Sequence, residues 1–146
     1  MKVLVIHGPN LNLLGTREPE VYGRTSLEAV NAMLEEEARN IGVDLECYQS
    51  NSEGDLITAV QNARGRVDTI ILNAAAYTHT SVALRDAVSA AEVPTIEVHL
   101  SNLASREPFR HQSTISQVVV GRIEGLGPES YRLAMRFIIG RLTGHE

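Results

Sequence analysis

An arginine and a tyrosine lie five positions apart in a short segment with a glycine at each end. Arg17 and Tyr22 stand between Gly15 and Gly23, soon after the first apolar run of the chain. Glycine ends let a segment swing, and an arginine beside a tyrosine can turn the phenol into a base at neutral pH. We interpret this segment, at about 15–23, as a mobile lid that carries chemistry. The competing interpretation is a surface loop whose Arg17 and Tyr22 face solvent.

The charge of Arg17 is large enough for that role. A tyrosine that acts as a base near pH 7 needs its pKa lowered by about three units, which is about 4 kcal/mol. A guanidinium about 4 Å away supplies about that much at an effective dielectric constant near 20. Arg17 alone therefore suffices if closure of the lid excludes water.

Length and composition predict one soluble domain spanning residues 1–146. The apolar runs are too short to span a membrane, and the run near the N-terminus is too short for a signal peptide, so we expect a cytoplasmic protein. The formal net charge of −5 argues against general nucleic-acid binding. The single cysteine, Cys47, excludes an internal disulfide, and we expect it to be a buried small side chain rather than a nucleophile.

Several kinds of catalysis lack the residues that they need. Lys2 is the only lysine and opens the first strand, at the end opposite the polar turn, which argues against covalent imine catalysis. The five histidines lack the spacing of a zinc site, so no metal is expected. Glycine-rich nucleotide motifs and the serine elbow of α/β-hydrolases are absent from the sequence, and no acidic cluster of the receiver type follows the first strand.

Apolar runs alternate with stretches of helical periodicity along the chain. Strands are predicted at Val3–Ile6, Val43–Tyr48, Thr69–Leu72, Ile96–Leu100 and Val118–Val120. Helices are predicted from a capping box at Thr25–Glu28 to about Asn40, from Ser52 to near Gly65, from Thr80 or Ser81 to about Ala91, and from Pro128 with an apolar stripe of Leu133, Ala134, Phe137, Ile138 and Leu142. This alternation predicts an α/β, flavodoxin-like three-layer fold with a five-stranded parallel sheet of order 2-1-3-4-5.

In such a fold a ligand binds beyond the carboxyl ends of the strands, at the switch point between the first and third strands. Polar residues gather at this rim: Asn10 and Asn12 after the first strand, Asn73, Tyr77 and His79 after the third, His99, Ser101 and Asn102 after the fourth, and Arg106 and Arg110 in the irregular stretch that follows. These side chains bring acid–base and anion-binding groups to one place.

Glu97 and His99 are two residues apart on a predicted strand, so their side chains share a face. A carboxylate can orient an imidazole, although a histidine merely satisfied at a strand end fits the same pattern. His7 is expected to be structural, and Arg85 with Asp86 is expected to be a solvated charge pair on a helix.

Five motifs, in this order and spacing, resemble type II 3-dehydroquinate dehydratase, the type II dehydroquinase of the shikimate pathway. They are HGPNLNLLGTREPEVYG at 7–23, QSNSEG at 49–54, NAAAYTHTS at 73–81, EVHLSN at 97–102 and REPFRHQS at 106–113. The resemblance covers nearly the whole chain. It implies reversible dehydration of 3-dehydroquinate by acid–base elimination through an enolate, with no cofactor.

The resemblance also implies roles for individual residues. Tyr22 is expected to be the general base, and Arg17 to hold it as phenolate. Asn10 is expected to bind a water that stabilises the enolate. His99, oriented by Glu97, is expected to protonate the departing hydroxyl.

Other residues are implied to bind the substrate: Asn73, His79 and Arg110 its hydroxyls, and Leu100 and Ser101 its carboxylate. The family assembles as trimers within a dodecamer, so Asp86 is expected to reach a neighbouring subunit's site. Ala74 and Ala75 stand where many members have Pro-Gly, which bears on the backbone beside Asn73. The alternative function is a non-catalytic flavodoxin-like domain that binds a small anion at the same rim.

Overall fold

The computed structural model describes residues 1–16, 18–22, 24–142 and 144. At its centre lies a five-stranded sheet, all parallel, of order β2-β1-β3-β4-β5. The strands are β1 (Lys2–His7), β2 (Asp44–Gln49), β3 (Thr69–Asn73), β4 (Thr95–His99) and β5 (Gly121–Glu124). The predicted fold class and strand order are therefore confirmed.

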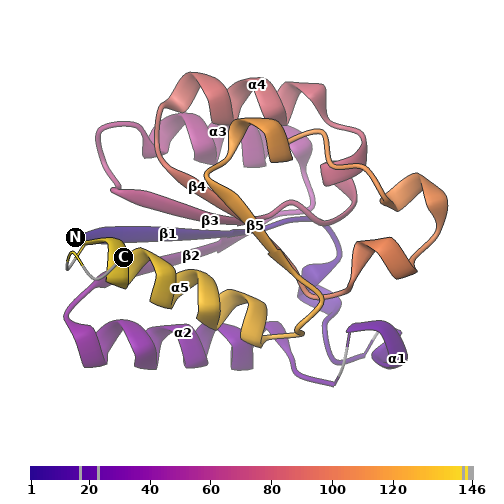
Figure 1. The fold of residues 1–146 in the computed structure, drawn as a ribbon, viewed down its shortest axis with the longest axis horizontal. Coiled ribbons are helices and arrows are strands. Elements are labelled where there is room, and N and C mark those ends of the chain that lie inside the picture. The colour runs from indigo at the N-terminus through magenta and orange to yellow at the C-terminus, as the bar shows by residue number, and fades with distance from the viewer. Residues whose placement is uncertain (17, 23, 143, 145–146) are drawn as a thin grey trace.

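Helices cover both faces of the sheet (Figure 1). One face carries α2 (Leu27–Ile41) and α5 (Glu129–Leu142), and the other carries α3 (Glu53–Ala63) and α4 (Val82–Ala91). Each face has its own apolar core, because alternate residues of a strand point to opposite sides. In β1, Leu4 and Ile6 pack toward α3 and α4, whereas Val3 and Val5 pack toward α2.

Serine residues begin three of these helices, although one lies a position later than the sequence predicted. Ser26, not Thr25, is the N-cap of α2, since its hydroxyl accepts from the amide of Ala29 at 3.1 Å. The predicted capping box is therefore wrong: Ser26 has the extended backbone of a cap residue, with φ −75° and ψ 162°. Ser52 and Ser81 cap α3 and α4 as predicted.

The fifth strand lies C-terminal to the predicted valine run. Ser116–Val118 forms a 3-10 turn, and β5 begins only at Gly121. Val118 and Val119 instead pack against the core beneath α3 and α4. Since β5 is an edge strand whose residues are half-buried or exposed, it has no apolar run by which periodicity could locate it.

The buried stripe of α5 also differs from the prediction. Its inward residues are Tyr131, Ala134, Met135 and Ile138. Ala134 and Ile138 are buried as predicted, but Leu133 and Phe137 are 38% and 46% exposed. The predicted stripe is therefore displaced by about one residue in helical phase, since successive residues turn by about 100°. The side chain of Leu142 lies outside the described part of the chain.

The predicted lid contains a short helix, α1 (Pro19–Tyr22). Proline suits the first turn of a helix because its φ is already fixed there, so this segment is not entirely a loop. At its start, Gly15 has φ +90°. Arg17, Gly23 and the side chain of Tyr22 lie outside what the structure describes.

The structure also bears on membrane spanning and on the reactivity of the Cys47 thiol. Among the described helices, each is too short or too polar to cross a membrane. Burial, with the nearby charges of Glu35 and Glu46, raises the pKa of the Cys47 thiol to about 12. The thiol is therefore protonated at neutral pH and a poor nucleophile, as expected, although Cys47 is half-buried rather than buried.

Candidate active site

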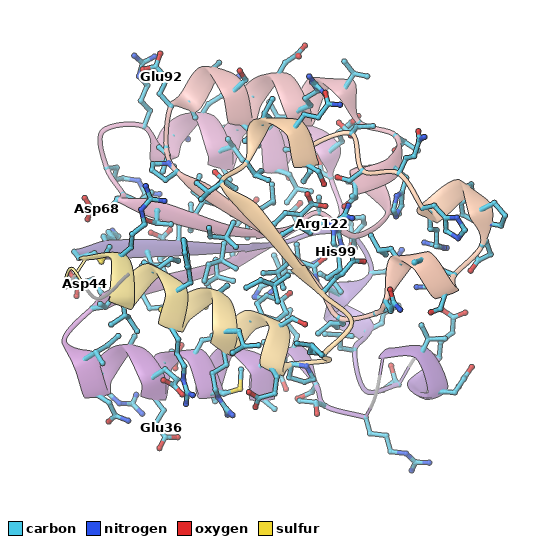
Figure 2. All side chains as sticks on the ribbon, in the orientation of Figure 1. Glu36, Asp44, Asp68, Glu92, His99 and Arg122 are labelled. Atoms are coloured by element: carbon cyan, nitrogen blue, oxygen red, sulfur yellow. The ribbon has the colours of Figure 1, made fainter. Side chains whose placement is uncertain are left out.

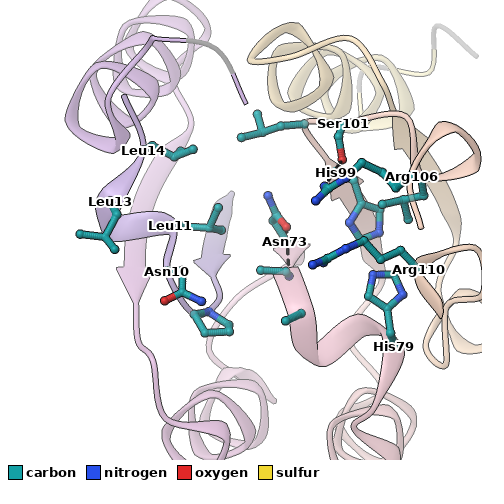
Figure 3. Close-up of a pocket in the computed structure, with 15 residues that line it drawn as sticks. Asn10, Leu11, Leu13, Leu14, Asn73, His79, His99, Ser101, Arg106 and Arg110 are labelled. Atoms are coloured by element: carbon teal, nitrogen blue, oxygen red, sulfur yellow. Dashed lines mark hydrogen bonds between the residues drawn. The ribbon is translucent and has the colours of Figure 1, made fainter. Parts of the chain in front are cut away.

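A pocket opens at the carboxyl ends of β1, β3 and β4, where the strand order predicted a ligand site (Figure 3). Its volume is about 660 Å³ including the open mouth. Lining residues come from four segments: Pro9–Leu11, Leu13 and Leu14 after β1; Asn73, Ala75, Ala76 and His79 after β3; His99–Ser101 and Leu103 after β4; and Arg106 and Arg110 beyond. Most of the predicted site residues therefore meet around one cavity.

Glu97 and His99 form a buried pair at the back of this pocket. Their side chains are 0% and 4% exposed, and Glu97 Oε2 lies 2.5 Å from His99 Nε2. Burial raises the pKa of Glu97, but hydrogen bonds from His99 and Ser116 outweigh burial and hold it below its ordinary value. An ionised carboxylate only accepts, so the proton of the pair resides on Nε2. Nδ1 is then the ring nitrogen that can serve a bound molecule.

His79 stands on the same wall as His99 (Figure 3). Its Nδ1 lies 2.8 Å from the carbonyl oxygen of Gln112, so Nδ1–H donates and Nε2 is an acceptor in the neutral ring. Burial and the neighbouring charges of His99 and Arg110 lower the pKa of His79, against the hydrogen bond to Gln112. A neutral His79 can therefore accept a hydrogen bond from a ligand hydroxyl.

Two arginines make this side of the pocket cationic. Arg110 Nε donates to Glu107 at 2.9 Å, and its guanidinium lies 4.9 Å from the centre of the Phe109 ring. Arg106 donates to the Ser101 hydroxyl at 3.2 Å. The sequence indicates Arg106 only as part of the irregular stretch at the rim, and its contact with Ser101 identifies it as a further pocket residue.

Asn73 stands in the middle of the pocket, and a buried chain of hydrogen bonds fixes it from behind. Its amide nitrogen donates to Tyr131 Oη at 2.9 Å, and Tyr131 Oη lies 2.9 Å from His7 Nδ1. His7 Nε2 lies 2.8 Å from Asn31 Oδ1. Asn73, Tyr131 and His7 are nearly inaccessible to solvent.

The chemistry of the donors fixes the direction of every bond in this chain. Asn31 Oδ1 can only accept, so His7 carries its proton on Nε2 and Tyr131 donates to His7 Nδ1. Burial lowers the pKa of His7 to about 4, against the opposing hydrogen bond to Asn31. Burial likewise raises the pKa of Tyr131, although its hydrogen bond with Asn73 opposes that shift. Both groups are neutral near pH 7, which confirms a structural role for His7.

Asn10 faces Asn73 across the pocket (Figure 3). It has a left-handed backbone, with φ 68°, which asparagine tolerates better than most residues. Its amide donates to Asn51 Oδ1 at 3.0 Å, and Gln49 donates to the same oxygen at 3.1 Å. The motif at 49–54 thus supports the loop that carries Asn10.

Among the described residues, one predicted substrate-binding residue lies away from the pocket, and two predicted catalytic residues cannot be placed. Asp86 is exposed on α4, away from the pocket, whereas Arg17 and the Tyr22 side chain lie outside the described residues. Arg85 is not simply solvated: it donates to the carbonyl of Thr114 and to Gln117. It therefore ties α4 to the segment after the pocket.

The described residues supply an acid, several hydroxyl partners and cationic groups. Within this described part, no three His, Cys, Asp or Glu side chains gather closely enough to hold a metal ion. Lys2 lies at the opposite end of the sheet, where its Nζ is 3.6 Å from Glu46. The arrangement can bind a small polyhydroxylated anion and deliver a proton to it from His99.

Known proteins share both the sequence and this fold. Residues 1–139 match the family described as dehydroquinase class II. A 3-dehydroquinate dehydratase of Geotalea daltonii is 52% identical over 142 residues, which cover 97% of this chain and 99% of that protein. One of Legionella pneumophila is 56% identical, over 97% of this chain and 98% of that protein.

Solved structures agree with the sequence relatives. The type II dehydroquinase of Butyrivibrio crossotus superposes with a TM-score of 0.92 at 44% identity, covering 94% of this chain and 96% of that one. The enzyme of Propionibacterium acnes gives a TM-score of 0.91 at 41% identity, covering 94% of each. The fold, the pocket and these similarities together establish that the chain belongs to the class II dehydroquinase family.

Proposed function

We propose that this protein is a 3-dehydroquinate dehydratase, which converts 3-dehydroquinate reversibly to 3-dehydroshikimate. The observation that carries this proposal is the Glu97–His99 pair, with Nδ1 of His99 available to the same pocket as Asn73, His79 and Arg110. Relatives at 52% and 56% identity bear the name of this activity. The alternative of a non-catalytic anion-binding domain has no support among them.

The reaction removes a proton from the carbon next to the ketone and then expels a hydroxyl. Tyr22, as phenolate, takes the proton, and the electron pair forms an enolate. Arg17 keeps Tyr22 ionised when the lid of residues 15–23 closes, and a water held by Asn10 stabilises the enolate oxygen. As the enolate re-forms the ketone, the hydroxyl leaves and receives a proton from His99, so that water is released.

Substrate binding divides between the two sides of the pocket. Asn73, His79 and Arg110 bind the substrate hydroxyls. Leu100 and Ser101 bind its carboxylate through backbone amides and the Ser101 hydroxyl, and the guanidinium of Arg106, which donates to Ser101, adds positive charge there. The position of Asn73 at the end of β3 supports its part in this assignment, because side chains held on strands orient a ligand better than side chains on loops do.

Ultraviolet absorbance tests the activity, because dehydration creates a conjugated enone carboxylate. Adding 3-dehydroquinate to the purified protein should raise the absorbance, and treatment with a chelator or borohydride should leave the rate unchanged. Folded protein that produces no absorbance change would exclude the proposed activity. Loss of rate with the chelator or with borohydride would overturn the metal-free, imine-free mechanism.

Tyr22→Phe tests the base, because it removes only the phenolic oxygen. We expect kcat to fall by about 10²–10⁴-fold, whereas calorimetric titration should find substrate affinity close to that of the wild type. Turnover near the wild-type rate would remove Tyr22 from the mechanism.

The assembly, the domain organisation and the location also belong to the proposal. We infer a single catalytic domain over residues 1–146, twelve copies of which assemble as four trimers, with Asp86 of each copy serving a neighbour. Family resemblance supports this assembly, and Asp86 lies exposed on α4 as such a role requires. A cytoplasmic location follows from the sequence argument alone.

A further inference from the structure

We propose that Ser116 is a positioning residue for His99, acting through Glu97, with Arg122 setting the direction of its hydrogen bond. The inference rests on the proposed role of His99 as the acid of the dehydration. It concerns residues on the side of Glu97 that faces away from the pocket.

Both oxygens of Glu97 are engaged at short distances. Ser116 Oγ lies 2.6 Å from Oε1, and His99 Nε2 lies 2.5 Å from Oε2. Glu97 itself is 0% exposed. A carboxylate bonded at both ends cannot rotate about its axis without losing a bond, and a lost bond is costly in a buried place.

Arg122 determines which way the Ser116 hydroxyl points. Its Nη1 lies 3.1 Å from Ser116 Oγ, and a guanidinium can only donate. Ser116 therefore accepts from Arg122 and has its own proton left for Glu97. The result is a one-way series of donors, from Arg122 to Ser116 to Glu97, met from the other side by His99.

The fold holds this series in place from two elements. Arg122 is paired in register with Glu97 across β5 and β4, and its Nε lies 3.0 Å from Glu124. Figure 2 shows Arg122 and His99 toward the same end of the sheet, away from Asp44 and Asp68. The hydroxyl of Ser113 accepts from the amide of Ser116 at 3.1 Å and so anchors the turn that carries Ser116.

The consequence for His99 is a choice of tautomer. A fixed, ionised Glu97 keeps one proton on Nε2, so the imidazolium form of His99 gives its Nδ1 proton to the leaving hydroxyl and returns to the neutral Nε2–H tautomer. Without the Ser116 hydroxyl, Oε1 has lost a donor and the carboxylate can turn away from Nε2. The ring is then free to adopt the other tautomer or another orientation, in which Nδ1 no longer meets the substrate.

Nuclear magnetic resonance tests this directly on the full-length protein. Long-range ¹H–¹⁵N spectra at alkaline pH distinguish the two neutral tautomers, and the signal missing in His99→Ala identifies the ring. We expect the Nε2–H tautomer in the wild type and an increased Nδ1–H population in Ser116→Ala. Ser105→Ala is the matched control, because its hydroxyl donates only to the carbonyl of Asn102 in the described contacts, and it should leave the spectrum unchanged.

Kinetics give a second readout. Ser116→Ala should lower kcat about tenfold, the order of one hydrogen bond to a charged group, with KM changed less than about twofold. Ser116→Thr, which retains a hydroxyl, should recover most of the loss. In a Glu97→Gln background, Ser116→Ala should add little, since residues that act through one another are not additive.

The outcomes separate the two proposals. If the wild type is active and Ser116→Ala has the same tautomer and the same kcat, Ser116 does not position His99. That result would leave the proposed enzyme activity intact. An equal loss in the wild-type and Glu97→Gln backgrounds would also overturn the positioning role, since Ser116 would then act elsewhere. Full activity of His99→Ala, or no dehydration by the wild type, would instead overturn the proposed function.

Discussion

Ala75 has a left-handed backbone, φ 51°, next to the central pocket residue. Its amide donates to Asn73 Oδ1 at 3.1 Å, so its conformation and the orientation of Asn73 depend on each other. Glycine adopts positive φ without strain, whereas alanine does not. Alanine at this position therefore stores strain beside the substrate.

Ala75→Gly should consequently stabilise the protein. Relief of the left-handed conformation contributes about 1–2 kcal/mol, and the greater freedom of glycine in the unfolded chain offsets about 0.4–1 kcal/mol of it. We expect a net gain in unfolding free energy of up to about 1.5 kcal/mol, measured by urea denaturation. Ala76→Gly is the control: Ala76 follows in the same 3-10 turn and is not among the described residues with positive φ, so its change should destabilise. Equal effects of the two changes would contradict the strain.

The sequence could predict single residues only where chemistry and spacing coincide. Glu97 and His99 were predicted as a pair because alternate residues of one strand share a face. The hydrogen-bond partners of His7 were not predicted. Tyr131 lies 124 residues away, and an aromatic residue in a helix predicts only apolar packing. Ser116 gave no signal either, because a serine after a polar stretch looks like any loop residue.

The backbone just after β1 lies in close contact with the backbone that leads from β3 into the 3-10 turn at Ala75–His79. The amide of Gly8 donates to the carbonyl of Asn73 at 2.7 Å. A Cβ on Gly8 would lie 2.6 Å from the carbonyl oxygen of Ala74, which is backbone and cannot swing aside. The glycine thus brings the loop of Asn10 and the turn of Asn73 together.

Gly8→Ala should therefore destabilise by about 1–3 kcal/mol, the usual cost of overpacking, and lower the dehydration rate by moving Asn10 away from Asn73. Gly54→Ala is the matched control, because in α3 the nearest heavy atom to its Cβ is 3.8 Å away. That change should be neutral or slightly stabilising, as alanine favours helix. Urea denaturation and the absorbance assay measure both effects, and a neutral Gly8→Ala would disprove the contact.

Stability at acidic pH depends on the histidine that joins β1 to α5. His7 has a folded pKa of about 4 against 6.5 when unfolded, so the unfolded chain binds the extra proton between these values. The contribution of neutral His7 to the free energy of unfolding is fully present above pH 6.5. It falls progressively as the pH drops toward 4, by about 3 kcal/mol in all.

The variant His7→Gln lacks this titration. Between pH 7 and pH 4.5 we expect the wild type to lose about 2–3 kcal/mol more of its unfolding free energy than His7→Gln does. Comparing the change with pH, rather than stability at one pH, cancels any constant cost of the substitution. Parallel losses in the two proteins would mean that His7 is not buried in its neutral form.

Strands with an apolar run were predicted best, and the half-buried edge strand β2 was also placed to within one residue. The interior strands β1, β3 and β4 are buried throughout and read as apolar runs, so their positions were correct to about a residue. The edge strand β5 is half-exposed, and a valine run at 118–120, of which Val118 and Val119 pack beneath α3 and α4, drew the prediction away from it. In α5 the largest inward residue is Tyr131, whose hydroxyl is committed to the site.

At the scale of the whole molecule, the pocket and the proposed contact surface between copies lie on different elements. The pocket occupies one end of the sheet, whereas α4 presents Asp86 and the 60% exposed Val82 on its outer face, since residues four apart in a helix lie together. This face suits contact with another copy, as the proposed assembly requires.

Light scattering should find a particle of twelve chains, each of 15.9 kDa. Val82→Asp, which puts a charge into the proposed contact, should give smaller particles with reduced dehydration activity, because Asp86 would no longer reach a neighbour. A fully active wild-type monomer would contradict both the assembly and the shared site.

The buried link from His7 through Tyr131 to Asn73 joins the beginning of the chain to its last helix. The strands β1, β3 and β4, whose carboxyl ends form the pocket, all precede Tyr131 in the sequence. Only the docking of α5 completes the hydrogen-bonded chain. A chain that ends before Tyr131 therefore leaves Asn73 without the hydroxyl that fixes it from behind the pocket, even if all five strands are present.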